Sequence, residues 1–198
     1  KDDIPPNKRP KTSQDSKNEM AETSEKECVD IIQRYYSEYF SLGKKATIAH
    51  DYTGLDQYVQ HHTNGLIVIG LAPSHPVLQQ GKTAIKVTWD YKAGNNKVRG
   101  KHKKGAMLFE AHTCVCTIEC SDGSKYCVRA GVRGKLIEIN DQLDNNPSLI
   151  VTRPRHEGYI AIFMQNKKQR ARLTDYVVDG HAYAKHRGVG KRAKPDSD

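Results

Sequence analysis

The chain has 198 residues, a formal net charge of +9 and a sequence pI near 9.3. Hydrophobic residues make up 36% of it and charged residues 28%, and the mean hydropathy is -0.75. This composition is polar for a chain of this size, so we expect one domain with polar tails. The chain has no run of about 18 apolar residues, so no membrane-spanning helix is expected. The basic balance favours nucleic acid, an anionic membrane or an acidic protein as partner.

Residues 1–23 are polar, lack hydrophobic periodicity and contain three prolines. They are therefore expected to form a disordered tail. Two short basic clusters resemble nuclear-import signals, although solvated tails also contain such clusters. These clusters are Lys8, Arg9 and Lys11 near one end, and Lys191, Arg192 and Lys194 near the other. They favour a nuclear location.

The first ordered element is predicted to be a helix that begins at Ser24. Ser24 and Glu27 fit a capping box, and apolar residues recur at intervals of three and four up to Phe40. That spacing is typical of a helix with one apolar face. The helix is expected to end before Gly43.

From about Ala46 the pattern changes to short strands separated by Gly, Pro and Asn. Asn64-Gly65 predicts a hairpin, and Asp122-Gly123 predicts a second hairpin with a type I′ turn. The expected strands are Tyr58–His62, Leu66–Ala72, Ala84–Asp90, Met107–Glu110, Thr113–Glu119, Ser124–Arg129, Lys135–Asn140 and Tyr159–Phe163. Many short strands of this kind predict a β-sandwich or barrel-like domain.

Two short helices are expected in the C-terminal half of the chain. Asn140 looks like the N-cap of a short helix, and a second helix is expected around Arg170–Val178. Basic residues outnumber acidic ones from Lys167 onwards. We therefore predict a polar tail over 1–23, a β domain with its N-terminal helix over 24–166, and a basic, partly helical tail over 167–198.

The five cysteines form no CxxC pair. Cys114, Cys116 and Cys120 share the parity of one strand, so they are expected on a single sheet face. This pattern favours small buried thiols over a metal site. It also favours a reducing compartment, the cytosol or the nucleus.

No motif of a known catalytic site is present. Asp56 and Glu110 stand apart without a carboxylate partner at a recognisable spacing, although two distant carboxylates can still meet in a fold. The adjacent His61 and His62 would point to opposite faces of a strand, so they are not expected to hold one metal ion. We predict a protein that is not an enzyme and has no cofactor and no metal.

A basic segment between two predicted strands is the candidate binding site for a polyanion or an acidic partner. Gly100 within the segment and Gly105 after it allow the backbone to follow a chain of phosphates. The segment has no aromatic residue for base stacking, which weakens an RNA-specific interpretation. A solvated basic loop is the alternative. The site residues are Lys97, Arg99, Lys101, Lys103 and Lys104.

The stretch Gly134–Asn140 (GKLIEIN) begins a spaced pattern that includes Leu143, Asn146-Pro147 and Glu157-Gly158-Tyr159. The pattern resembles the glycine cleavage H protein. This resemblance implies a mainly β, lipoyl-like single hybrid motif, also called a barrel-sandwich hybrid. Aligned without gaps, the lipoyl lysine of that family falls on Gly123, and Lys125 is two positions away. A lipoyl carrier is therefore disfavoured.

A larger set of stretches resembles the Abitram (Simiate) family, which is described as actin-binding transcription modulators. These stretches are Arg34–Tyr36, His75–Lys82, Lys97–Lys101, Lys104–Ala106, Cys120–Gly123, Val132–Leu136 and Glu157–Ala161. The resemblance covers about Cys28 to Phe163 and implies a nuclear, partly cytoplasmic protein with actin as partner. The alternative is an RNA- or ribonucleoprotein-binding adaptor that uses the basic segment and the C-terminal tail.

Overall fold

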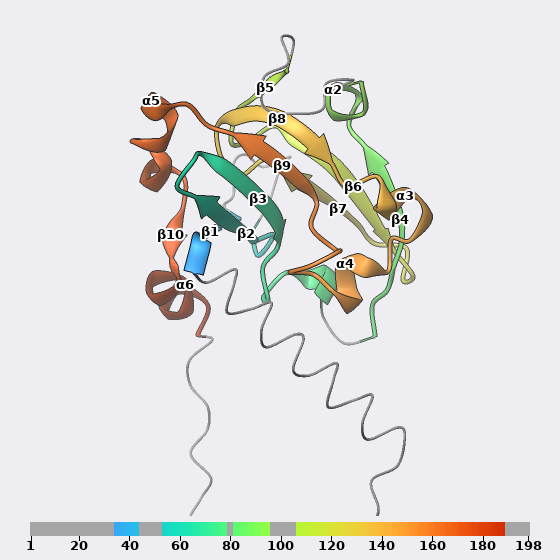
Figure 1. Cartoon of the computed structure of the whole chain (residues 1–198). Coiled ribbons are helices and arrows are strands. Elements are labelled where there is room, and N and C mark those ends of the chain that lie inside the picture. The colour runs from blue at the N-terminus through green and yellow to red at the C-terminus, as the bar shows by residue number, and fades with distance from the viewer. Residues whose placement is uncertain (1–33, 44–52, 79–80, 96–105, 189–198) are drawn as a thin grey trace, which may run out of the picture. The chain divides into compact units, whose positions relative to one another are not determined.

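The computed structural model describes residues 34–43, 53–78, 81–95 and 106–188 (Figure 1). The chain divides into two units, Lys1–Tyr36 and Ser37–Asp198. The described residues of the second unit build two sheets of antiparallel strands, which confirms the mainly β prediction. No helix within the described ranges is long and apolar enough to cross a membrane.

The larger sheet has the strand order β10-β1-β2-β3-β9-β8-β5. Its strands are β1 (Tyr36–Ser41), β2 (Gln57–His62), β3 (Leu66–Leu71), β5 (Leu108–Phe109), β8 (Gly134–Ile139), β9 (Ala161–Met164) and β10 (Val178–Asp179). The smaller sheet has the order β4-β6-β7. It consists of β4 (Ala84–Trp89), β6 (Cys114–Cys120) and β7 (Lys125–Arg129).

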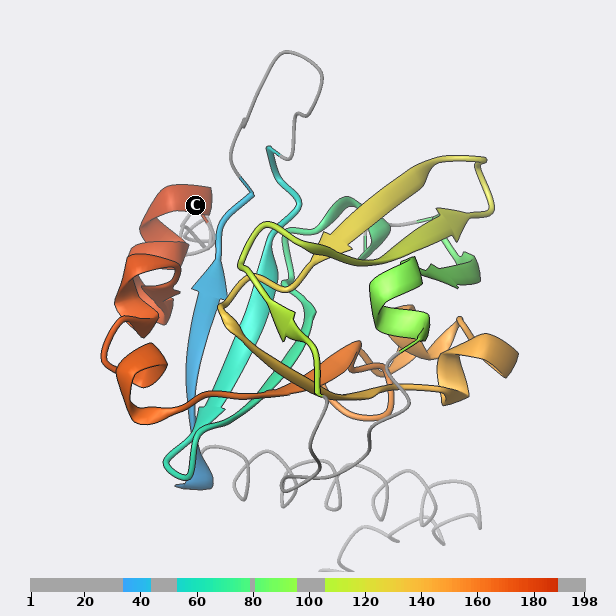
Figure 2. The same ribbon diagram turned by 90° about the horizontal axis from the view of Figure 1, so that it is seen from above.

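Short helices connect and flank the strands. They are η1 (Pro76–Leu78), α2 (Tyr91–Gly94), α3 (Gln142–Asn145), α4 (Leu149–Thr152), α5 (Lys167–Arg170), η2 (Leu173–Asp175) and α6 (Gly180–Arg187). Figure 2 shows α6, in red, beside β1. Tyr183 of α6 stacks on Phe40 of β1 with ring centroids 3.9 Å apart.

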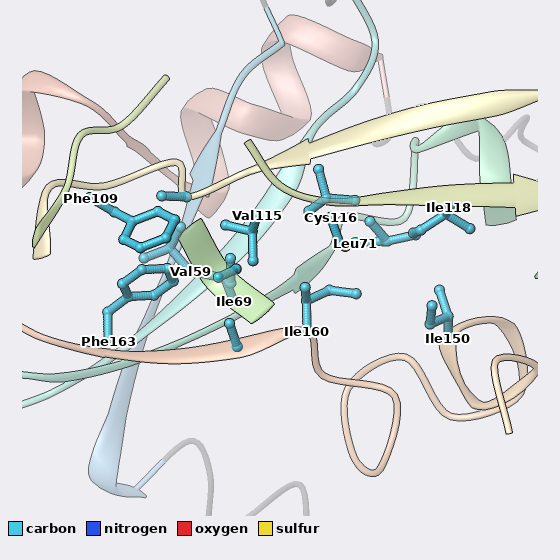
Figure 3. Close-up of a cluster of buried hydrophobic side chains, with 14 of the residues drawn as sticks. Val59, Ile69, Leu71, Phe109, Val115, Cys116, Ile118, Ile150, Ile160 and Phe163 are labelled. Atoms are coloured by element: carbon cyan, nitrogen blue, oxygen red, sulfur yellow. The ribbon is translucent and has the colours of Figure 1, made fainter. Parts of the chain in front are cut away.

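The hydrophobic core collects side chains from both sheets (Figure 3). Val59 and Ile69 come from the larger sheet, and Val115 and Ile118 from the smaller one. All four are fully buried. The alternation along each strand directs every second residue inward, so each sheet buries one face against the other.

Both predicted hairpins are confirmed. β2 and β3 pair around Asn64-Gly65, and β6 and β7 pair around Asp122-Gly123. The type I′ prediction for the second turn is wrong. Such a turn needs positive φ at both Asp122 and Gly123, whereas positive φ occurs only at glycines among the described residues. Cys120 and Ser124 close a three-residue connection in which Gly123 has φ +78°. This is the form in which a type I turn is followed by one left-handed residue.

The end of the predicted N-terminal helix is wrong, and its earlier part lies outside the described residues. Tyr36–Ser41 is a strand, in which Tyr39 lies opposite Asp179 and Phe40 opposite Val178 of β10. The burial of Phe40 and the bonds to a distant strand outweigh the local helical spacing.

Asn140 does not cap the helix that follows it. Asp141 occupies the N-cap of α3 without a side-chain cap bond. The buried Asn140 side chain instead donates to the carbonyl oxygens of Glu157 and Tyr159, at 2.6 and 2.8 Å. It therefore ties the end of β8 to the segment that leads into β9.

The predicted helix over Arg170–Val178 is also wrong. The segment contains η2 and the start of β10, and Leu173 and Val177 join the main core. Because β10 pairs with β1, Tyr183 stacks on Phe40 and Arg187 binds the buried Asp56, residues up to Arg187 of α6 contribute to the folded unit.

Candidate functional site

A basic cleft lies where β9 leads into α5, at one end of the larger sheet. Lys135 of β8 lies opposite Met164 of β9, so the chain that leaves β9 passes beside the start of β8 (Figure 1). The cleft has a volume of about 400 Å³. It is lined by the cations Arg133, Lys135, Lys168 and Arg172, together with Leu108, Asn166, Gln169 and Tyr176.

The wall formed by α5 is held by local hydrogen bonds. Asn166 and Gln169 form a capping box, in which each side chain accepts from the other residue's backbone N–H at 2.9 Å. The buried Gln165 donates from Nε2 to the Arg133 carbonyl oxygen at 2.7 Å. The sequence after β9 thus begins the short helix and also anchors it to the segment before β8.

The other wall depends on a close approach of β8 and β9. A side chain at Gly134 would place its Cβ 3.3 Å from the Met164 carbonyl oxygen, so glycine suits this position. Gly134 and Leu136 are buried, whereas Lys135 between them is exposed. The alternation of the strand therefore directs the Lys135 ammonium outward.

Two of the four cations in the cleft have acidic partners. Arg133 Nε lies 3.0 Å from Glu110 Oε1, in an ion pair that lacks hydrogen-bond alignment. Arg172 Nε lies 2.9 Å from Asp175 Oδ2, and this hydrogen bond raises the pKa of Arg172. Lys135 and Lys168 are exposed and form no ion pair with another described residue. Among the described residues, these two ammonium groups have no acidic partner, so the cleft offers them to an anion.

Only part of this site follows from the sequence. The basic segment Lys97–Lys104 and both import clusters lie outside the described residues, so their hypotheses stay predictions. Lys168 and Arg172 come from the segment predicted as a basic tail. Sequence reasoning missed Arg133 and Lys135, although the alternation from Gly134 onward was the signal that β8 has an outward face.

The tip of the β6–β7 hairpin carries no lysine. Lys125 lies on β7 opposite Glu119, with Nζ 3.3 Å from a carboxylate oxygen. Asp122 at the tip bonds to Ser124 and lies 3.1 Å from Lys82 Nζ. Bonds from the Ser124 hydroxyl and backbone, and then from Lys82, lower the pKa of Asp122 to about 2. The tip is thus an ionised carboxylate with a cationic partner.

The two carboxylates singled out in the sequence each face an arginine. Glu110 pairs with Arg133, and the fully buried Asp56 accepts two bonds from the Arg187 guanidinium. Within the described part of the chain, no three His, Cys, Asp or Glu side chains are grouped to hold a metal ion.

The chain was compared with family models, with solved structures and with curated proteins. No family model matches it. A glycine cleavage system H protein from Mycobacterium marinum aligns over 76% of this chain and 96% of its own, at 13% identity and a TM-score of 0.47.

Curated relatives are much more similar. Protein Abitram of Dictyostelium discoideum is 40% identical over 159 residues, which cover 80% of this chain and 89% of the relative. Protein Abitram of Homo sapiens is 32% identical over 166 residues, which cover 82% and 89%. These relatives match the chain over most of their own length. The chain therefore belongs to the Abitram family.

Proposed function

We propose that this chain is a non-catalytic binding protein that holds an acidic surface of actin in the basic cleft, and thereby modulates actin organisation or transcription. The observation that carries the proposal is the pair of ammonium groups of Lys135 and Lys168, which form no ion pair within the described part of the chain and lie beside two arginines. The proposal of actin as the partner rests on the resemblance to the Abitram family. The nuclear and cytoplasmic location is part of the same proposal.

The composition of the cleft favours a protein partner over a nucleic acid. Leu108 and Tyr176 line it together with Arg133 and Arg172, and protein interfaces are enriched in tyrosine and arginine at their anchors. Tyr176 is the one aromatic residue in the lining, whereas single-stranded nucleic acid is held by several stacking side chains. Exposed lysines at the rim speed association and make it salt-dependent.

The test is co-sedimentation of the full chain with filamentous actin at low salt. Replacing both lysines in the variant Lys135→Gln/Lys168→Gln is expected to weaken binding roughly tenfold, which corresponds to about 1.4 kcal/mol. The matched control is Lys86→Gln/Lys185→Gln, which removes the same charge from two exposed lysines outside the cleft. The control is expected to bind within about twofold of the unmodified chain.

A third variant separates the cleft from the basic segment. Lys101→Gln/Lys103→Gln/Lys104→Gln neutralises three cations of the segment and leaves the cleft intact. A loss of binding in this variant alone would move the contact away from the cleft. Failure of the unmodified chain to sediment with actin at low salt would remove the actin role altogether.

RNA or ribonucleoprotein binding is the second candidate, favoured by the net charge of +9. Affinity purification with and without nuclease distinguishes it from the first. We expect the associated proteins to remain bound after nuclease treatment, because in this proposal the cleft contacts a protein surface directly. Their loss on nuclease treatment would support the RNA adaptor and count against the actin proposal.

A further inference from the structure

A β-bulge places two cysteines side by side on the outer face of the smaller sheet. The parity of Cys114 and Cys116 predicts a common face, and the structure contradicts this. Cys114 lies opposite Arg129, but Cys116 lies opposite Val128, so β6 contains one extra residue between them. The bulge reverses the alternation at this point. Cys116 is buried, while Cys114 is half-exposed on the same face as Cys127.

The two sulfur atoms are already close. Cys114 Sγ and Cys127 Sγ are 2.7 Å apart, on neighbouring strands and 13 residues apart in sequence. A disulfide bond is ~2.05 Å long, so the sulfurs need to approach each other by roughly 0.7 Å. Small rotations about χ1 provide such a movement. Cys120 is buried without such a partner sulfur within the described residues.

The surroundings give the two thiols different acidities. The hydrogen bond between the two sulfur atoms lowers the pKa of Cys127, and the positive charge of Arg129 acts in the same direction. The same bond, together with burial, raises the pKa of Cys114. Since the thiolate is the reactive form of cysteine, we expect Cys127 to react first and Cys114 second.

We propose that Cys114 and Cys127 are a redox-active dithiol that a hydroperoxide converts to a disulfide across β6 and β7. The Cys127 thiolate attacks one peroxide oxygen, the O–O bond breaks, and hydroxide leaves and is protonated to water. The resulting Cys127 sulfenic acid is attacked by the Cys114 sulfur, the S–O bond breaks, and the leaving hydroxide takes the Cys114 proton. Two thiols and one hydrogen peroxide thus give one disulfide and two waters.

The reverse reaction needs only a dithiol reductant, which restores both thiols by exchange through a mixed disulfide. A reversible pair of this kind is compatible with a reducing compartment. The site is separate from the basic cleft, because neither cysteine lines it. The proposal therefore does not depend on the proposed function.

The experiment treats the reduced full chain with hydrogen peroxide and then alkylates the remaining thiols with N-ethylmaleimide. Intact mass should show two fewer alkyl groups than the untreated chain. Trypsin cleaves after Lys104, Lys125 and Arg129, so Cys127 lies in the peptide 126–129 and Cys114 in 105–125. We expect a disulfide between these two peptides, which a dithiol reductant releases.

Serine variants assign the bond. Cys114→Ser and Cys127→Ser should each lose it, whereas the matched control Cys120→Ser should keep it. In Cys114→Ser, dimedone should label Cys127, because its sulfenic acid has no resolving thiol. Circular dichroism of each variant shows whether its fold is intact. Full alkylation of the peroxide-treated unmodified chain, or a bond that survives in Cys127→Ser, would overturn the proposal.

Discussion

At the residue scale, Asp56 shows how a carboxylate is held in a β core. Its oxygens accept from the Gly43 N–H and the Ser74 hydroxyl, each at 2.8 Å, and from the Arg187 guanidinium. Burial alone would raise the pKa of Asp56, but the bonds from Arg187, Gly43 and Ser74 outweigh it and leave the pKa below 3.8. The ionised form therefore contributes to the stability of the fold.

The variant Asp56→Asn is expected to lower the free energy of unfolding by about 3 kcal/mol, because it leaves the Arg187 charge without its partner. The folded-state pKa is depressed, so the contribution of Asp56 is present above its unfolded-state pKa. It is lost as the pH falls through the folded-state pKa. The difference from the unmodified chain should thus be largest near pH 7 and shrink below pH 3.8. Urea unfolding across this range measures it.

Asp175→Asn is the matched control for that change. Asp175 forms an exposed pair with Arg172, and exposed pairs contribute at most about 1 kcal/mol. Equal losses in the two variants, or a difference that does not change with pH, would contradict the account of Asp56.

At the element scale, the predictions that held are those with a local cause. The strands around Asn64-Gly65 and Asp122-Gly123 follow from turn residues and alternation, which lie within a few positions of each other. The two helix predictions that failed concern the segments that form β1 and β10. These strands lie near opposite ends of the sequence and pair with each other, Tyr39 with Asp179 and Phe40 with Val178. The backbone bonds and apolar contacts between them override the local helical spacing.

Removing residues 167–198 is therefore expected to destabilise the fold. The cut deletes Leu173, Val177 and Tyr183, which are buried, and uncovers Phe40. Each such side chain contributes about 2 kcal/mol through burial, so the loss is on the order of 5 kcal/mol, comparable with the stability of a whole domain. A chain ending at Gly188 is the control and should melt like the full chain. Circular dichroism during heating measures the melting temperature of each chain. An unchanged melting temperature in the chain that ends at Asn166 would support the predicted domain boundary there.

At the scale of the whole molecule, part of the basic charge gathers in one cleft. Arg133 and Lys135 come from the β8 region, and Lys168 and Arg172 from the segment after β9. Antiparallel pairing of β8 with β9 brings the two groups together. The net charge of +9 favoured a polyanionic partner of some kind, either nucleic acid, an anionic membrane or an acidic protein. Only this pairing shows where four of the cations converge.

The two terminal clusters are expected to act on the location of the whole chain. With Lys8, Arg9, Lys11, Lys191, Arg192 and Lys194 changed to alanine, the nuclear fraction should fall because importins bind such basic clusters through their charge. The chain is only 22.3 kDa, so a large fluorescent fusion is used to prevent passive entry, and microscopy measures the nuclear fraction. The control replaces the exposed lysines Lys86, Lys125 and Lys185. An equal nuclear fraction in both variants would contradict the import role.

The sequence by itself determined the fold class, the two hairpins and most strand positions, because turn chemistry and strand alternation act over a few residues. The tertiary structure decided the rest. It made a strand of Tyr36–Ser41, joined Arg133 and Lys135 to Lys168 and Arg172 in one cleft, and placed Cys114 beside Cys127. Each of these features depends on pairing between distant segments or on a bulge of one residue. Such pairing is set by the packing of the whole core and leaves no periodic signal in the sequence.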